Sequence, residues 1–550
     1  MSSDPKRLLA DAYGKALAKE APEHADFPVA FEKPRQPEHG DFACSIALQL
    51  GKRLKRNPRQ LAEALTAGAL AAFPEFDKFF AGFEIAGPGF INFRLRSQVK
   101  LAAIALALQP GWGRRRKEKP ESIQVEFVSA NPTGPLHVGH GRQAAIGDAL
   151  AAVLESQGDK VTREFYYNDA GAQIQNLALS VQARKRGLEP GAAGWPQDGY
   201  AGEYIADIAK AYGGPDDLES IRKFAVDYLR KEQDLDLREF GVKFDVYYLE
   251  SSLYTEGKVE EVVKALVASG KTYDKDGALW LRTTEYGDDK DRVVRKSDGD
   301  WTYFAADCAY YLDKRKRGFD RVVIMLGADH HGYVGRMRAM AACFGDDPDA
   351  HLEILIGQLV NLVRNGEPVR MSKRAGTVIT LEDFVEALGV DATRYALARY
   401  SSDSPIDIDI ELWTRASREN PVYYVQYVAA RTASVARNAA EVGLTRGAAG
   451  DFRPELLTHP KENELLKALG EYPEVVASAA ELREPHRVAR YLEEQVAASY
   501  HRFFDNCRVL PLGDEEITDL NRARLWLNDA TRTVIANGLH LLGVSAPERM

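Results

Sequence analysis

The sequence predicts an α/β protein with three parts: a central parallel sheet with crossover helices, a small α/β domain before it and an all-α domain after it. Strand and helix patterns alternate from about residue 120 to 390, a hairpin pattern precedes them, and only helical patterns follow. A chain of 550 residues has room for about three domains. We therefore expect domains at 1–112, 120–390 and 391–550, with an insertion at about 170–300 in the second.

The composition is that of an ordinary globular chain, with 45% hydrophobic and 28% charged residues. The net charge of −9 means that local basic clusters must hold any polyanionic partner. Candidates are Lys52–Arg59, Arg114–Lys119 and Lys314–Arg317, although such runs usually face solvent. The four cysteines are widely spaced, and no apolar run is long enough for a signal peptide or a membrane span. We expect a cytoplasmic protein without zinc.

The first domain is expected to combine two helices with a hairpin. Apolar residues at every fourth position from Phe42 to Leu54 predict one helix, and Asn57-Pro58 is typical of the N-cap and first turn of another. Alternating residues on both sides of Gly87-Pro88-Gly89 predict an antiparallel hairpin that ends near Leu95.

The second domain begins with a strand, a loop and a helix around Glu126–Arg142. His137 and His140 stand where the loop becomes the helix. A helix N-terminus suits a polyphosphate, and both imidazoles can donate to the same phosphate chain. Gly139 leaves room for a flat base to approach the backbone. Taken alone, the motif is more typical of a surface loop with two incidental histidines.

The second half of the sheet is expected to resume at the apolar strand Arg321–Leu326, after the helical, charged insertion. The loop Gly327–Gly332 follows this strand. By the switch-point rule it should face the histidine loop across a ligand crevice. Further on, the cationic segment Val369–Thr377 either faces solvent or closes on phosphates during a reaction.

The helical end of the chain contains an apolar stripe from Val422 to Ala436. This stripe leaves Tyr423, Tyr427 and Arg431 on a neighbouring face. The trio is either a platform on which nucleic-acid bases stack or part of a seam between helices.

Together these motifs resemble those of the class I aminoacyl-tRNA synthetases. His137-Val-Gly-His140 is similar to the His-Ile-Gly-His signature of that class, and Arg370-Met-Ser-Lys-Arg374 to its Lys-Met-Ser-Lys-Ser signature. Within the class the chain resembles the arginyl-tRNA synthetases in the segments Ser129–His140, Gly40–Ala43, Gly89–Phe93, Asp391–Tyr395 and Ala546–Met550. The second signature departs from its pattern at both ends, so only Lys373 is carried over as the catalytic lysine.

The resemblance implies a Rossmann-type catalytic domain, a leading domain that contacts tRNA and a helical anticodon-binding domain. It implies ATP-dependent activation of L-arginine and transfer of the arginyl group to the 2′-hydroxyl of the terminal adenosine of tRNA(Arg). Mg²⁺ is expected with ATP, and the protein is expected to be a monomer. A guanidinium is a planar fork that is always charged, so its pocket needs carboxylates, preferably two.

The same resemblance implies roles for individual residues. The catalytic residues are His137, His140 and Lys373. The ATP-binding residues are Pro132, Gly134, His137, Gly139, His140, Gly327, Asp329, His330, Met371, Ser372 and Lys373. The arginine-binding residues are Ser129, Asn131, Glu250, Tyr303, Asp307 and His331, and the tRNA-binding residues are Tyr423, Tyr427 and Arg431. Tyr303 and Asp307 stand four apart, which places them on one face of a helical turn.

Three other functions compete with this one. A class I synthetase for another amino acid, such as glutamate or lysine, would need a different pocket charge. A catalytically silent tRNA-binding paralogue would lack the histidines or Lys373, which are present. A small-molecule adenylyltransferase of the same superfamily would have no use for the helical part at 391–550.

Overall fold

The computed structural model describes residues 5–32, 34, 39–96, 104–109, 111–169, 171–330, 332–364, 366–369 and 379–550, with only the backbone at 329 and 449. The chain divides into two compact units. One comprises Met1–Gln109, Thr445–Gly470 and Pro511–Ala530, and the other Pro110–Leu444, Glu471–Leu510 and Thr531–Met550.

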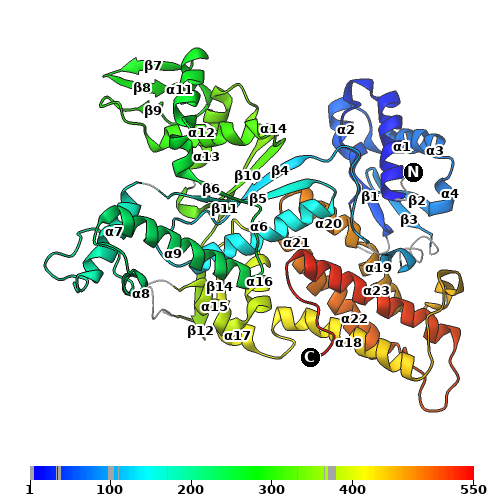
Figure 1. The fold of residues 1–550 in the computed structure, drawn as a ribbon. Helices are drawn as coiled ribbons and strands as arrows, with labels where there is room; N and C mark the ends of the chain where they lie inside the picture. The colour runs from blue at the N-terminus through cyan, green and yellow to red at the C-terminus, as the bar shows by residue number, and fades with distance from the viewer. Residues whose placement is uncertain are drawn as a thin grey trace. The chain divides into compact units, whose positions relative to one another are not determined.

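The N-terminal part of the first unit packs helices against an antiparallel sheet in the order β1-β3-β2 (Figure 1). Its core contains Tyr13, Phe31 and Phe93, whose rings meet edge to face. The predicted hairpin is confirmed, because β2 and β3 pair across the glycine turn. The elements are α1 (Pro5–Glu20), η1 (Pro22–His24), β1 (Phe42–Cys44), α2 (Ile46–Leu54), α3 (Pro58–Ala72), α4 (Phe76–Phe79), β2 (Phe80–Ala86) and β3 (Phe90–Leu95), with α19 (Pro460–Gly470) from the later chain.

The helix predicted from Phe42 to Leu54 is wrong at its start. Phe42–Cys44 forms β1, which pairs with β3, and the helix begins only at Ile46. The backbone of this segment finds its partner 50 or so residues away, which local periodicity does not reveal. The second predicted helix is confirmed: the Asn57 side chain accepts backbone N–H bonds at 2.9 and 3.3 Å, and α3 begins at Pro58.

The second unit is built on a five-stranded parallel sheet in the order β11-β10-β4-β5-β6. In chain order, β4, β5 and β6 follow one another toward one edge of the sheet, and β10 and β11 then follow one another toward the other edge. The order therefore reverses between β4 and β10, and the switch-point rule predicts a ligand crevice at this position. The strands are β4 (Ser122–Glu126), β5 (Lys160–Tyr167), β6 (Val246–Leu249), β10 (Arg321–Gly327) and β11 (Leu352–Gly357).

Helices connect and cover these strands. The first of them, α6, follows β4 directly and packs on the sheet (Figure 1). The helices are α6 (Val138–Ser156), α7 (Ala172–Lys185), α8 (Glu203–Ala211), α9 (Leu218–Glu239), α10 (Glu250–Thr255), α11 (Lys258–Ala268), α12 (Tyr303–Lys316), η4 (Ala328–His330), α13 (Tyr333–Cys343) and α14 (Pro348–His351).

The insertion expected at 170–300 is not one continuous stretch. Its middle contributes β6 to the main sheet, parallel to β5. Helices α7, α8 and α9 precede this strand. A small antiparallel sheet follows it, formed by β7 (Thr272–Lys275), β8 (Ala278–Leu281) and β9 (Arg292–Arg295). With only four residues, β6 is too short to stand out from the charged sequence around it.

Beyond β11 the chain forms a second, smaller sheet in the order β13-β12-β14. Strand β14 contradicts the prediction that no strand follows residue 391, because it pairs in parallel with β12. The elements are β12 (Val360–Arg364), β13 (Glu367–Pro368), α15 (Leu381–Leu388), α16 (Val390–Ala398), β14 (Ile406–Asp409) and α17 (Ile410–Thr414).

The rest of the chain is helical, as predicted. The expected stripe on α18 is buried at Val422, Val425, Ala429 and Thr432, while Ala436 is half-buried. A π-helical stretch at Leu492–Ala497 joins α21 to α22. The helices are α18 (Pro421–Glu441), α20 (Tyr472–Glu481), α21 (His486–Tyr491), α22 (Ala498–Asn506) and α23 (Asp519–Leu541).

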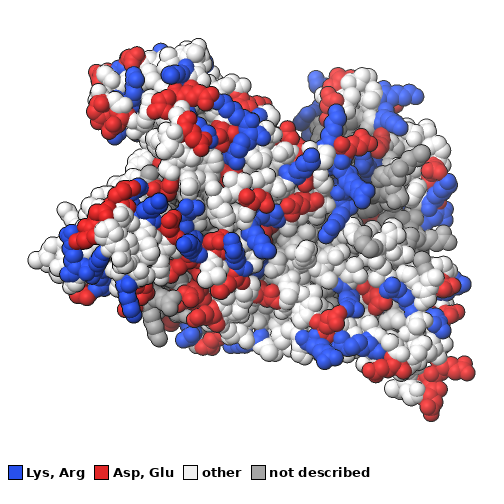
Figure 2. All heavy atoms as spheres, viewed as in Figure 1, with Lys and Arg blue, Asp and Glu red and all other residues white. Residues whose placement is uncertain are grey.

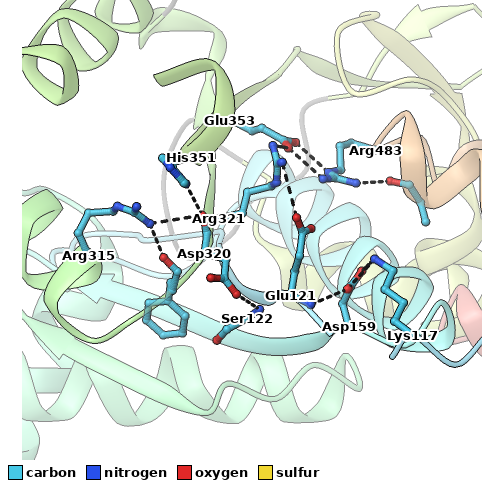
Figure 3. Close-up of polar contacts among 12 residues, drawn as sticks. Lys117, Glu121, Ser122, Asp159, Arg315, Asp320, Arg321, His351, Glu353 and Arg483 are labelled. Atoms are coloured by element: carbon cyan, nitrogen blue, oxygen red, sulfur yellow. Dashed lines mark hydrogen bonds and ion pairs between the residues drawn. The ribbon is translucent and has the colours of Figure 1, made fainter. Parts of the chain in front are cut away.

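The edge of the main sheet at which the strands begin is lined with ion pairs (Figure 3). Arg321 and Arg483 both bind Glu353, at 2.7 and 2.8 Å, and Lys117 binds Asp159 at 2.6 Å. Carboxylates at this edge therefore have cations supplied by the chain itself.

Lys and Arg are intermingled with Asp and Glu over the face in Figure 2. This mixing agrees with the expectation that any polyanion is held by local clusters. Among the described residues, no helix is long and apolar enough to cross a membrane.

Candidate active site

The candidate site lies at the opposite edge of the main sheet, where the parallel strands end. The turn after β4 is strained, since Val128 and Ser129 have φ values of +68° and +41°. The Ser129 hydroxyl donates to Glu126 at 3.0 Å and accepts from the backbone N–H of Tyr166 at 3.2 Å. The turn thus fixes Ser129, an expected arginine ligand, between the ends of β4 and β5.

A buried ion pair lies beneath this turn. Glu126 pairs with Lys314 of α12, whose side chain is fully buried. The Lys314 ammonium also lies 4.1 Å from the centroid of the Tyr310 ring. Each of these two buried charges is stabilised by the other, because either charge alone would carry a large, uncompensated desolvation cost.

The insertion holds the loop between β4 and α6. Gln233 of α9 donates to the carbonyl oxygens of Asn131 and Gly134 at 3.1 and 2.8 Å. Asn131 in turn donates to Gln173 of α7 at 2.6 Å, and Pro132 is buried. Helices α7 and α9 of the insertion therefore position the expected ligands in this loop. A nucleotide-binding sheet does not require these helices for its own fold.

The two histidines form a capping box at the start of α6. His137 Nδ1 accepts from the N–H groups of Gly139 and His140 at 3.1 and 3.4 Å, and His140 Nδ1 accepts from the His137 N–H at 3.2 Å. The rings stack with centroids 3.6 Å apart. With Nδ1 accepting, each neutral ring carries its proton on Nε2, the atom able to donate to a phosphate.

Burial, and then the neighbouring His137, lowers the pKa of His140 to about 3. His140 is therefore neutral at any working pH. A methyl group on Gly139 would lie 2.9 Å from the His137 ring, so the glycine is needed for the stacked histidines themselves. Its expected contact with a base stays a prediction.

Two carboxyl groups face the site from different elements. Glu250 opens α10 directly after β6 and accepts the hydroxyl of Tyr166 at 2.8 Å. Asp307, on α12, accepts the hydroxyl of Tyr333. The end of β5 also brings Asp169 close, where it binds the N–H and hydroxyl of Ser251 at 2.9 and 2.7 Å.

Both carboxyl groups ionise less readily than usual. Burial, and then the charges of Asp307 and Asp169, raises the pKa of Glu250 to about 7, against the hydrogen bond from Tyr166. Burial raises the pKa of Asp307 to about 6, against the hydrogen bond from Tyr333. Raised pKa values of this kind are typical of functional sites, and that of Asp307 is raised even though the charge of Arg336 acts to lower it.

The remaining expected ligands are partly described. Tyr303 lies four residues before Asp307 on α12, as predicted, and is 64% exposed; its hydroxyl approaches the Gly171 turn. Gly327 ends β10, and His330 follows it in η4, beside the end of β4. The side chain of Asp329 and the residues His331, Arg370, Met371, Ser372, Lys373 and Arg374 lie outside the described residues.

Sequence reasoning missed several residues of this site. Tyr166 and Tyr333 bind the two pocket carboxyls, and Lys314 supports the serine turn through Glu126. One signal was available: Glu126 is a charged residue between the apolar residues Val125 and Phe127, which usually means a specific partner. The partner itself is 188 positions away and carries no local signal.

The expected tRNA-binding trio lies elsewhere, on α18, and the structure brings its members together. The rings of Tyr423 and Tyr427 stack with centroids 6.0 Å apart. The Arg431 guanidinium lies 4.5 Å from the Tyr427 ring and 4.3 Å from that of Phe504. Tyr427 and Arg431 line a cavity of about 780 Å³ whose other walls include Arg437, Phe504, Arg508, Arg549 and Met550.

Three family models match the chain in succession. The model of the "Arginyl tRNA synthetase N terminal domain" matches residues 6–95. That of "tRNA synthetases class I (R), catalytic domain" matches 104–189 and 199–399, and the "DALR anticodon binding domain" matches 425–550.

Individual relatives agree with the models. The chain is 55% identical to an arginine–tRNA ligase of Kineococcus radiotolerans over 540 residues, which covers 96% of this chain and 95% of that protein. The Thermus thermophilus arginyl-tRNA synthetase has a similar fold, with a TM-score of 0.79, 22% identity and coverage of 99% and 100% of the two chains. An arginyl-tRNA synthetase of Plasmodium falciparum has a TM-score of 0.75 at 16% identity, with 99% of each chain covered.

The switch-point sheet, the histidine box at its first helix and the matching catalytic model define a class I aminoacyl-tRNA synthetase. Identity over almost the whole length then decides among amino acids. The chain belongs to the arginyl-tRNA synthetase family.

Proposed function

We propose that the chain activates L-arginine with ATP and transfers the arginyl group to a tRNA, with the site residues acting as described here. As a family member the chain is a ligase, with ATP as substrate. Within the site, the observation that supports arginine is the pair of carboxyl groups of Glu250, which is buried, and Asp307, which is half-buried, with their raised pKa values. A guanidinium supplies the missing positive charge and a planar set of donors for both.

In the first step, an oxygen of the arginine carboxylate attacks the α-phosphorus of ATP. The bond from that phosphorus to the bridging oxygen breaks, which gives arginyl-adenylate and pyrophosphate. In the second step, the 2′-hydroxyl of the terminal adenosine attacks the arginyl carbonyl carbon. The acyl–oxygen bond to the phosphate breaks, AMP leaves, and the hydroxyl proton passes to AMP or solvent. Positioning and charge neutralisation supply most of the rate.

The ATP subsite is proposed along the switch point. His137 and His140 donate from Nε2 to the phosphates, and the α6 N-terminus adds its dipole. Lys373 neutralises the departing pyrophosphate. Further contacts to ATP are proposed for Pro132, Gly134, Gly139, Gly327, Asp329, His330, Met371 and Ser372.

The arginine subsite is proposed where β4, β5 and β6 end. Glu250 and Asp307 bind the guanidinium, Tyr303 covers it, and Ser129 with Asn131 bind the α-amino and carboxylate end. His331 completes the pocket. The support is the convergence of Ser129 and Glu250 on Tyr166, which hydrogen-bonds to both.

Mg²⁺ is proposed to arrive with ATP. Among the described residues, no group of three or more His, Cys, Asp or Glu side chains forms a candidate cation site. Mg²⁺ that binds with a nucleotide is usually held by the substrate phosphates, one or two carboxylates and water. When bound, such an ion neutralises phosphate charge.

The anticodon side of the tRNA is proposed to bind at the helical end of the chain. The cavity beside α18 combines arginines with the aromatic rings of Tyr427 and Phe504, a combination suited to phosphates and stacked bases. In this arrangement Tyr423 stacks on Tyr427, and the Arg431 guanidinium lies over the rings of both Tyr427 and Phe504. The leading domain is proposed to contact the tRNA elsewhere.

We further propose that the protein is a cytoplasmic monomer. All four cysteines are buried free thiols, which suits a reducing compartment. Light scattering at micromolar concentration tests the monomer.

An ATP–pyrophosphate exchange assay across amino acids, with and without tRNA, tests the function. We expect exchange with arginine and background rates with lysine and glutamate, because neither offers a planar double donor. Exchange with glutamate or lysine at a rate like that of arginine would overturn the proposal.

A further inference from the structure

A buried arginine on α16 lies where four segments of the chain meet. Arg394 is fully buried, and its guanidinium forms an ion pair with Asp148 of α6 at 2.6 Å. It also donates to the carbonyl oxygens of Phe240, at 2.9 Å, and Leu542, at 3.2 Å. We call these four residues the Arg394 junction.

The two carbonyl groups come from helix ends of the same type. Phe240 caps α9, and Leu542 directly follows α23. Each helix ends in a left-handed glycine, Gly241 or Gly543, followed by the backbone bond from C″ to C3 that defines a Schellman motif. Carbonyls at a helix C-terminus carry partial negative charge, so one guanidinium binds two helix ends and a carboxylate together.

Each chain segment that meets at the Arg394 junction is connected to a part of the protein that has a role in the proposed reaction. Helix α6 begins with the histidine box. Helix α9 holds the loop before that box through Gln233. The C-terminal tail continues from Leu542 past Ser545, which Asp391 binds at 3.0 Å, to Met550 in the wall of the cavity beside α18.

We infer that Arg394 is a positioning residue that couples occupancy of the cavity beside α18 to the placement of the histidine box. Nothing in this role requires Arg394 to touch a substrate. A tRNA whose anticodon end binds against the tail fixes the position of the tail at Leu542. The Arg394 guanidinium, which binds Leu542, Phe240 and Asp148, transmits this change of position to α6 and α9. The inference rests on the proposed function, since it needs the tail cavity to bind tRNA.

Glycine 543 offers a sharp test. A methyl group there would lie 2.0 Å from Arg394 Nη2, so Gly543→Ala forces the guanidinium away from its acceptors. The matched control is Gly443→Ala, after α18: this glycine has the same left-handed backbone and the same type of helix-ending hydrogen bonds, but no atom lies within 4 Å of the added methyl. Both variants carry the same backbone strain, and only one touches the junction.

The measured quantity is the ratio of kcat values, at saturating arginine, ATP and tRNA, for two transcripts. One is an arginine tRNA transcript, and the other is the same transcript with its anticodon bases replaced. We expect a ratio of about 10 in the unmodified protein and in Gly443→Ala, and about 2 or less in Gly543→Ala, in line with typical coupling between sites. A purely structural role would lower both rates and leave the ratio unchanged.

A second variant keeps the test valid if Gly543→Ala melts too easily. Asp148→Asn removes the charged acceptor on α6 without straining the backbone, and it should also reduce the ratio, to about half or less of that of the unmodified protein. An unchanged ratio in folded variants, or a ratio of 1 in the unmodified protein, overturns the inference. If the unmodified protein charges neither transcript with arginine, the proposed function fails instead.

Discussion

At the residue scale, the two pocket carboxyl groups link arginine binding to proton release. A bound guanidinium favours their ionised forms, so it lowers pKa values that stand near 7 for Glu250 and 6 for Asp307 in the free protein. Between these values binding must expel protons, while at pH 8 both groups are already ionised. His140, with a pKa of about 3, contributes nothing in this range.

We therefore expect arginine binding to weaken as the pH falls from 8 to 6. Calorimetry in two buffers of different ionisation enthalpy should record the release of about half a proton or more at pH 6.5 and close to none at pH 8. Equal proton release at both pH values would mean that neither carboxyl group faces the guanidinium.

Asp307→Asn isolates one of the two charges. The variant keeps the size of the side chain but removes a charge that faces the ligand, so the apparent affinity for arginine should fall by about 2 to 5 kcal/mol while that for ATP is kept. Asp274→Asn, on the exposed strand β7, is a control for a change of net charge. If ATP binding fell as much as arginine binding, Asp307 would be a structural residue.

Lys373→Ala tests the cationic loop. Charge on the leaving pyrophosphate develops only in the transition state, so kcat should fall by roughly 100-fold or more with little change in the KM for ATP. Arg370→Ala is a useful second variant, because it tests whether the arginine that stands in place of the signature lysine contributes to kcat. A kcat unaffected by Lys373→Ala would remove this lysine from the mechanism.

At the scale of elements, α18 tests the proposed tRNA site. Tyr427→Ala removes a ring from the cavity wall and should weaken tRNA binding by about 1 to 3 kcal/mol. Tyr424→Ala, on the same helix, is the control: both rings pack against His501, with centroids 4.7 Å from it for Tyr424 and 6.0 Å for Tyr427, but of the two only Tyr427 lines the cavity. Filter binding supplies the affinities, and thermal melting shows whether each variant is folded. Unaltered tRNA affinity in folded Tyr427→Ala would place the anticodon on another face.

Elements with strong local signals were predictable. The strand, loop and helix around the histidines followed from periodicity and turn residues, and the hairpin near Leu95 from its glycine turn. Strand β14 was missed although Ile406 and Ile408 alternate with aspartates, because the helical patterns around them dominate the composition. Its partner β12 is distant in sequence, and a four-residue strand cannot be recognised unless the strand that pairs with it is known.

The candidate site was predictable only as far as family motifs reach. Glu250, Asp307 and the histidines came from the resemblance, and the structure places Glu250 and Asp307 within each other's electrostatic influence. The supporting contacts were not accessible. Lys314 under Glu126, or Gln233 against Asn131, depends on long-range packing, which no local pattern encodes.

At the scale of the whole molecule, residue 391 is not a place where the chain can be cut without loss. A chain that ends at 390 would lack β14 and Arg394, and with them one of the three strands of the smaller sheet and one of the two arginines that bind Asp148 on α6. Asp148 would keep its pair with Arg163, but α6 would lose α16, which packs against it. We expect the shortened chain to lose cooperative thermal unfolding. A melting temperature like that of the full chain would show that the nucleotide fold stands alone.

The cluster of carboxylates at the end of the sheet has a kinetic consequence before any bond is made. Arginine is a cation, whereas ATP and tRNA are polyanions, so one crevice must attract opposite charges at neighbouring subsites. Beyond a Debye length of about 8 Å at physiological ionic strength, solvent screens the field of the carboxylates of Glu250 and Asp307, so this field acts mainly on charges in their immediate surroundings. On the proposed arrangement of subsites, arginine and the phosphates of ATP are therefore attracted separately, each by the charges of its own subsite.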